Sequence, residues 1–155
     1  MRIMIYEGRT FHESKTLDLE RWLGSDQYVV WVDMMGPNAD DTKLLRDVFR
    51  FHPLAIDQVL DHKQRPKVEE YTDHLFTIMN SAQVDGSDVY FRELDIFVRD
   101  NLLVTIHRFP EPGIDEARKR ANEACLLKGI TTGYLLYSLV QVIVDSYFPV
   151  LDRIE

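Results

Sequence analysis

Apolar and polar positions divide the chain into short segments of different kinds. Two early segments, 2–6 and 28–32, are rich in β-branched and aromatic residues, which is typical of strands. The second reads YVVWV and is apolar without alternation, as expected for a strand covered on both faces. A short helix is predicted between them, at 17–23. These segments predict a sheet with helices on both of its faces.

Two helices are predicted in the next part of the chain, and we expect them to pack as a pair. Asn38 and Asp41 have the spacing of a capping box at the start of the first helix. The apolar stripe of this helix comprises Leu44, Leu45, Val48 and Phe49. The second helix is predicted at 53–61, because Pro53 suits a first helical turn and His52 precedes it in the capping position.

The helix that begins at Pro53 has two different faces. Ile56, Val59 and Leu60 fall on one side, where they would meet the core. Asp57 and Asp61 are four residues apart and come together on the other side. The sequence therefore predicts a short helix with a core face and an acidic face.

The pattern becomes extended after residue 67. Strands are predicted at 74–84, 89–98 and 102–107, separated by the turn signals Asp85-Gly86 and Asp100-Asn101. Strands joined by such short turns pair with their neighbours in sequence. We therefore expect an antiparallel meander.

Two further helices complete the order of elements. One runs to about residue 127 and is closed by Gly129, and the last begins near Thr131. The order predicts an α/β fold, a mixed sheet of about six to seven strands with an antiparallel meander and helices on both faces, in three α/β/α layers. We expect 1–130 to form this α/β domain and 131–155 to begin a long helix.

Length and charge narrow the possible functions. A chain of 155 residues with 45% hydrophobic content is sufficient for one core. The formal net charge of −8 disfavours strong binding to nucleic acid or to an anionic membrane surface and allows attraction of cations. The single cysteine, Cys125, suits a reducing compartment and is interpreted as a packing residue.

The two ends of the chain bear on its location. The start, MRIMIYEGRT, has no secretory signal, and the most apolar stretch, 134–144, is eleven residues long against roughly twenty for a bilayer span. The sequence is thus expected to be soluble as given. Its last helix ends at LDRIE without a cap or a glycine, and we expect that helix to continue in a longer protein.

Two separated blocks resemble one known family. The segment from His52 to Tyr71, HPLAIDQVLDHKQRPKVEEY, is followed by HLFTIM, and the segment from Tyr134 to Phe148 reads YLLYSLVQVIVDSYF. From about Trp31 to the last residue, the chain resembles the soluble N-terminal domain of the CorA family of divalent metal-ion transporters.

The resemblance implies a regulatory role. In that family this domain lies on the cytoplasmic face of the membrane, and acids between neighbouring subunits of a homo-pentamer bind Mg²⁺ and hold the pore closed. It implies Mg²⁺, and possibly Co²⁺, as a weakly bound regulatory ion, and membrane attachment through helices that lie C-terminal to this sequence. It also implies that this piece does not itself conduct ions.

The family pattern selects Asp57 as the candidate metal ligand. The family has two consecutive acids after HPL, whereas Asp57 is followed here by Gln58. A further acid is expected where this chain has Gln141, four residues before Asp145. An amide offers a neutral oxygen, which weakens attraction of the ion.

Two alternatives remain open. A soluble metal-dependent enzyme would use His52, Asp57, Asp61 and His62, and it predicts a cleft that joins these side chains. The chain lacks the glycine-rich phosphate loops and the nucleophile and cysteine motifs of common enzyme classes, so we predict that it is not an enzyme. The second alternative is the regulatory domain of a related zinc transporter.

Overall fold

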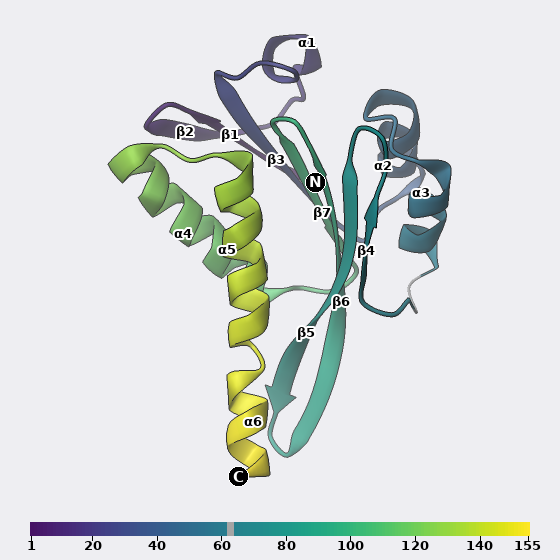
Figure 1. The fold of residues 1–155 in the computed structure, drawn as a ribbon, viewed down its shortest axis with the longest axis vertical. Helices are drawn as coiled ribbons and strands as arrows, with labels where there is room; N and C mark the ends of the chain where they lie inside the picture. Colours follow the sequence, from purple (N-terminus) through teal and green to yellow (C-terminus); the bar gives the residue numbers. More distant parts are fainter. Residues whose placement is uncertain (62–63) are drawn as a thin grey trace.

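The structure, a computed structural model, describes residues 1–61 and 64–155 and is organised around one seven-stranded sheet (Figure 1). The strands lie in the order β2-β1-β3-β7-β6-β5-β4. Their bounds are β1 Arg2–Glu7, β2 Thr10–Ser14, β3 Tyr28–Met35, β4 Lys67–Glu70, β5 Leu75–Asp85, β6 Asp88–Arg99 and β7 Leu102–His107. The predicted mixed sheet is confirmed, and β2 is an edge strand that the pattern did not reveal.

The sheet is mixed because one of its pairs is parallel. Strands β3 and β7 run in the same direction, with Asp33 opposite Thr105 and Met35 opposite His107. The other neighbours are antiparallel, and β5, β6 and β7 form the predicted meander. The carboxyl ends of β3 and β7 consequently meet at one edge, where polar side chains from both strands come together.

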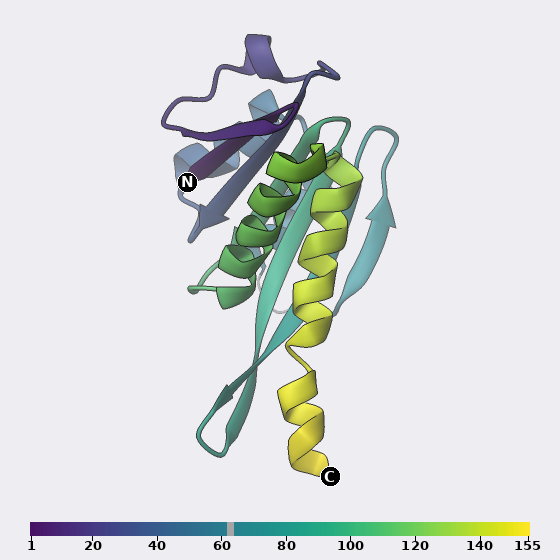
Figure 2. The same cartoon turned by 90° about the vertical axis from the view of Figure 1, so that its left-hand side faces the viewer.

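Helices cover both faces of the sheet, which confirms the three layers (Figures 1 and 2). They are α1 Leu19–Trp22, α2 Ala39–Lys43, the π-helical η1 Leu44–Val48, α3 Pro53–Leu60, α4 Pro112–Lys128, α5 Thr132–Asp145 and α6 Phe148–Ile154. Val30 and Val32 enter the cluster under η1 and α3, whereas Val29 and Trp31 enter the cluster under α4 and α5. The unbroken apolar run of β3 is explained by this double burial.

The helix predicted after Asn38 forms, but it changes type after one turn. Asn38 and Asp41 make the predicted capping box. From Leu44 the helix widens, and the amide of Phe49 donates to the carbonyl of Leu44 over 2.9 Å, a five-residue step. This wider turn leaves Val48 39% exposed, so its predicted place in the core stripe is wrong.

The predicted last helix is interrupted. Helix α5 ends at Asp145 and α6 begins at Phe148, with Pro149 in its first turn. At the break, Tyr147 donates its hydroxyl to the carbonyl of Asn80 over 2.6 Å. The break is therefore fastened to β5.

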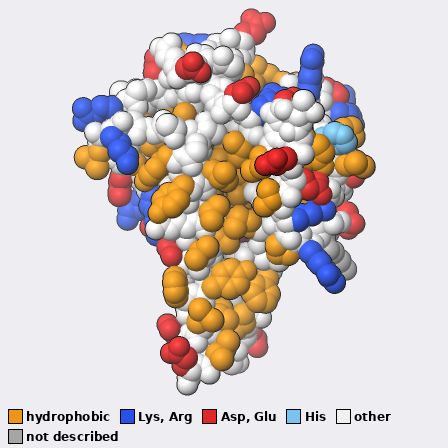
Figure 3. All heavy atoms as spheres, viewed as in Figure 1, with side chains coloured by type: hydrophobic (Ala, Val, Ile, Leu, Met, Phe, Trp, Pro, Cys, Tyr) orange, Lys and Arg blue, Asp and Glu red, His pale blue; other side chains and the backbone are white. Residues whose placement is uncertain are grey.

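The lower end of the molecule is apolar on its surface. The β5–β6 hairpin and α6 project together beyond the core (Figures 1 and 2), and Figure 3 shows hydrophobic side chains over this projection. By length and composition, Thr132–Ile154 would suffice to cross a membrane, contrary to the expectation that no segment would. Its first part is nevertheless a core helix, because Leu135, Leu139 and Ile143 are buried against the sheet.

Candidate functional site

Helix α3 is held in place at its N-terminus by stacked rings. His52 caps the helix by accepting a hydrogen bond from the Leu54 amide at Nδ1, over 3.1 Å. The His52 amide donates to Nε2 of His74 over 3.2 Å, and Nδ1 of His74 lies 2.6 Å from Asp73, which lowers the pKa of that carboxyl. Tyr71 stacks on both imidazoles, at 4.5 Å and 4.8 Å between centroids. Both histidines are thus engaged in positioning α3.

One face of α3 meets the core. Ala55, Ile56 and Val59 are buried. Leu60 is 45% exposed, so its predicted core position is wrong. The reason is that Ala55 and Val59, four residues apart, lie one above the other and occupy the centre of the inner stripe. Leu60 therefore falls at the edge of that stripe, in the last turn.

The other face of α3 presents Asp57 to solvent. Its carboxylate lines a shallow pocket of about 360 Å³ together with Asp61 and Glu69. Asp61 accepts a hydrogen bond from the side chain of Gln64 over 3.0 Å. Among the described residues, Asp57 has no side-chain hydrogen bond or ion pair. Its oxygens therefore remain available to a ligand.

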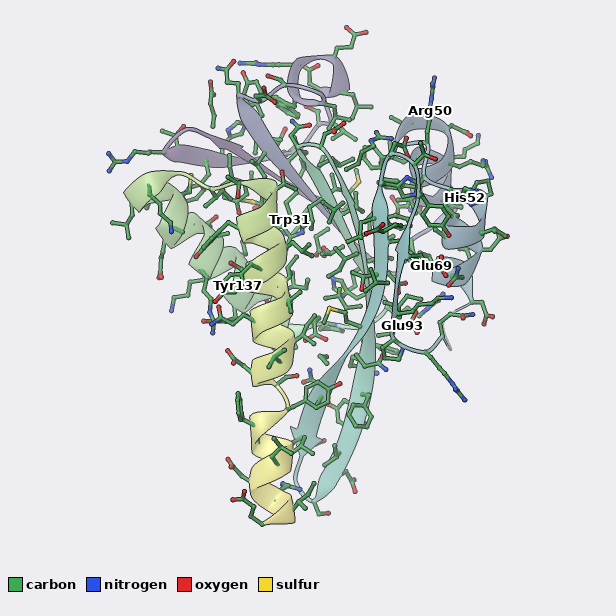
Figure 4. The ribbon with its side chains drawn as sticks, viewed as in Figure 1. Trp31, Arg50, His52, Glu69, Glu93 and Tyr137 are labelled. Atoms are coloured by element: carbon green, nitrogen blue, oxygen red, sulfur yellow. The ribbon has the colours of Figure 1, made fainter. Side chains whose placement is uncertain are left out.

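Glu69, on the neighbouring strand β4, is already fully engaged (Figure 4). The Tyr71 hydroxyl donates to it over 2.5 Å, and Lys67 pairs with it at 3.0 Å. Both contacts lower the pKa of the Glu69 carboxyl, and the hydrogen bond from Tyr71 has the larger effect. The amide of Gln58 donates to both of its oxygens, at 3.3 Å and 3.2 Å. The amide at position 58 therefore suits its neighbour better than an acid would.

The second amide position is remote from the first. Gln141 is exposed on α5, on the opposite face of the sheet from α3 (Figure 1). Asp145 lies one turn later and pairs with Arg120 at 3.5 Å. Positions 58 and 141 could act on one ion only if they came from different copies of the chain.

Asp57 is not part of a larger group of metal-ligating side chains in the part of the chain that the structure describes. Within residues 1–61 and 64–155, the structure contains no cluster of three or more His, Cys, Asp or Glu side chains arranged to hold a metal. Mg²⁺ commonly retains several waters and needs only one or two carboxylates. Asp57, which is exposed and makes no ion pair within residues 1–61 and 64–155, offers one such carboxylate.

Of the residues of the enzyme alternative, the described ones do not all line one pocket. His52 is the cap at one end of α3, and it is absent from the lining of the pocket that Asp57 and Asp61 share. His62 lies outside the described residues.

A buried polar group at the carboxyl ends of β3 and β7 escaped the sequence analysis. Asp33 Oδ1 accepts hydrogen bonds from Thr105 over 2.5 Å and from Nε2 of His107 over 3.0 Å, and Arg118 lies 3.9 Å from Oδ2. Trp31 donates to the Thr105 hydroxyl over 3.0 Å. An aspartate within a run as apolar as YVVWVDMM was the available signal.

Comparison with known proteins decides the family. The model of the CorA-like Mg²⁺ transporter proteins matches residues 26–155, which is most of the chain. The chain belongs to the CorA family. The predicted resemblance to its soluble N-terminal domain is thereby confirmed, and the family is one of transporters rather than enzymes.

Individual relatives agree with this assignment. YfjQ of Bacillus subtilis is 37% identical over 143 residues, which cover 91% of this chain and 44% of YfjQ. The cobalt/magnesium transport protein CorA of Thermotoga maritima is 26% identical over 161 residues, covering 100% of this chain and 46% of that protein. This CorA-family chain thus spans less than half the length of either relative.

A solved structure shows the same fold. The soluble domain of CorA from Methanocaldococcus jannaschii matches with a TM-score of 0.70 at 23% identity, covering 98% of this chain and 59% of that one. The α/β fold is therefore that of a CorA soluble domain.

Proposed function

We propose that this chain is the cytoplasmic regulatory domain of a CorA-type magnesium or cobalt channel, and that it does not itself conduct ions. The observation that carries the proposal is the carboxylate of Asp57 on the outer face of α3, which has no side-chain partner in the described part of this CorA-family chain. A carboxylate presented by a rigid, capped helix is suited to meet an ion that another subunit also contacts.

The full transporter would be a homo-pentamer attached to the membrane by helices beyond this domain, with the domain on the cytoplasmic face. Two acidic surfaces repel each other without a cation and attract when a divalent ion lies between them. The bound ion therefore favours the assembly in which the two surfaces are close together. A rise in ion concentration would in this way favour the closed state of the pore.

Binding at Asp57 is expected to be weak and regulatory. The position beside it is Gln58, which is committed to Glu69, and Gln141 offers a neutral oxygen. Fewer charged ligands lower the affinity for Mg²⁺ or Co²⁺. The domain would therefore respond only to high cytosolic concentrations of the ion.

Limited proteolysis of the full-length transporter tests this proposal. Mg²⁺ should slow cleavage of the wild-type assembly, and Asp57→Asn should remove most of that protection. Asp40→Asn, an equally exposed aspartate on α2, is the matched control and should behave as the wild type. Equal protection of all three proteins would exclude Asp57 as a regulatory ligand.

The oligomeric state provides a separate check. Light scattering should give a pentamer for the full-length transporter and a monomer for the isolated 155-residue chain, because assembly is proposed to need the helices that follow. A stable pentamer of the isolated chain would show that the contacts lie within this domain instead.

A further inference from the structure

A second pocket lies on the inner side of α3, between that helix and the sheet. Its volume is about 360 Å³. Glu93 and Asp95 of β6 both contribute to its wall, since residues two apart on a strand share a face. Val59, on the inner face of α3, also lines the pocket, whereas Asp57 is exposed on the outer face of that helix. Figure 4 shows Glu93 on β6.

The two acids leave oxygens without donors. Glu93 Oε1 and Asp95 Oδ1 are buried and accept no hydrogen bond from the other described residues. The two carboxyls can form a hydrogen bond with each other only when one of them is protonated. Asp95 is only 4% exposed. A buried carboxylate without a partner is costly, so the pair needs a proton or a cation between its members. Burial, followed by the charge of Glu93, accordingly raises the pKa of Asp95 to about 9.

The basic groups around this pocket make their direct contacts with other partners, and the charge of Arg108 acts on Asp95 only from a distance, where it offsets a small part of the rise in pKa. The Arg108 guanidinium donates to the Val59 and Leu60 carbonyls at the end of α3, at 3.4 Å and 3.1 Å. The Arg92 guanidinium lies 4.1 Å from the ring centroid of Phe109. His107 Nε2 faces Asp33. Within the described chain, no cation pairs with Glu93 or Asp95 at salt-bridge distance.

We propose that Glu93 and Asp95 bind a hydrated divalent cation in the pocket beneath α3. Two adjacent carboxylates offer the hard oxygen ligands that Mg²⁺ and Mn²⁺ accept. The pocket is far larger than a bare ion, and at about 30 Å³ for each water molecule it has room for the waters that Mg²⁺ retains. The amide side chains of Asn80 and Gln64, which also line the pocket, add neutral oxygens toward those waters.

This site lies within one chain, so it does not depend on the assembly proposed for Asp57. Ile106 and Phe91 form apolar parts of its wall, which lower the local dielectric and strengthen the attraction between ion and carboxylates. A single isolated domain should therefore bind one ion.

Titration calorimetry of the 155-residue chain with Mn²⁺ and with Mg²⁺ tests the site. The wild type should bind one ion, and Glu93→Gln or Asp95→Asn should weaken binding by at least about tenfold. Asp40→Asn, at an exposed aspartate of α2 that lines neither pocket, should bind as the wild type does. The isolated chain lacks the neighbouring copy with which Asp57 is proposed to share an ion, which separates this inference from the proposed function. Thermal unfolding of each variant verifies that it is folded; both amides are close in shape to the acids they replace.

Paramagnetic relaxation locates the ion independently. Mn²⁺ should broaden the methyl signals of Val59 and Ile106 in the wild type, and Asp95→Asn should abolish that broadening. Absence of binding in the wild type, binding unchanged in both amide variants, or binding lost in Asp40→Asn would overturn the site. Binding of spermidine in place of Mn²⁺, with equal affinity, would also overturn it, because it would show a site for organic amines.

Discussion

The side chain of Gln58 donates to Glu69 across the gap between α3 and β4, with its amide nitrogen 3.2 Å from Oε2. The resemblance to the family led us to expect an acid at position 58. The amide found there provides a hydrogen bond that ties α3 to the edge strand of the sheet, and it places no second charge beside Asp57.

Gln58→Glu is expected to lower the free energy of unfolding by about 1–3 kcal/mol in metal-free solution, because a donor to Glu69 becomes a like charge. Mg²⁺ should recover part of this loss, since the new carboxylate lies beside Asp57. Urea unfolding with and without Mg²⁺ measures both effects. Gln58→Ala is the control, and it should lose stability without any recovery; an equal response of both variants to Mg²⁺ would refute the explanation.

His107 is expected to make stability depend on pH. Burial lowers its pKa, but the hydrogen bond to Asp33, the charge of Asp33 and the carbonyl of Phe109 raise it more, so the net shift is upward. A raised pKa means that the folded state binds the proton more tightly than the unfolded chain does. The stabilisation that protonated His107 gives the folded state is therefore fully present below the ordinary histidine pKa near 6.5. It is lost as pH rises through the higher folded value.

His107→Gln tests that assignment, because an amide can still donate to Asp33 but does not titrate. Urea unfolding across pH 5.5–9 should show a smaller decline of stability in the variant than in the wild type. Parallel pH profiles for the two proteins would show that His107 is not the responsible group.

Asp95→Asn is expected to stabilise the metal-free protein. The asparagine amide can donate to the Glu93 carboxylate without taking up a proton, whereas Asp95 must be protonated to do so, and the gain should be about 1–3 kcal/mol at neutral pH. Because burial and Glu93 raise the pKa of Asp95 to about 9, the wild type loses stability as pH rises from near 4 to 9, and the variant gains most at the upper end. Thermal unfolding in a chelator at pH 5 and pH 8 provides the comparison; a variant less stable than the wild type at pH 8 would contradict the acid pair.

The break between α5 and α6 should depend on Tyr147. Tyr147→Phe removes the hydroxyl that donates to the Asn80 carbonyl and should cost about 1 kcal/mol. Amide hydrogen exchange in 146–154 should accelerate because α6 loses its attachment to β5. Tyr137→Phe on α5, where the side chain is 58% exposed, is the matched control and should leave exchange unchanged; acceleration in both variants would point to a different cause.

Local patterns in the sequence were sufficient for much of the fold. YVVWV predicted a doubly covered strand because its five side chains enter the two core clusters in turn. Asn38 predicted its capping box because the contact spans only three residues. Strand β2 escaped prediction since only Phe11 within it is substantially apolar. Pro149 was the signal for the broken last helix, because a proline near the first turn suits a helix start better than an interior.

The sites required information that spacing does not contain. Asp57 was selected from a family pattern, whereas the commitment of Glu69 to three neighbours depends on how β4 lies beside α3. Glu93 and Asp95 read as ordinary polar positions in a strand. They lose access to water only in the folded chain, where α3 and the segment after β7 cover them without supplying a hydrogen-bond donor.

Ion uptake by the full-length transporter in liposomes tests the regulatory role most directly. With a fluorescent Mg²⁺ indicator inside the vesicles, Mg²⁺ on the side of this domain should slow uptake by the wild type and by Asp40→Asn. Asp57→Asn should retain uptake at low Mg²⁺ and lose most of that inhibition. Inhibition of Asp57→Asn at the same Mg²⁺ concentration as the wild type would contradict the account.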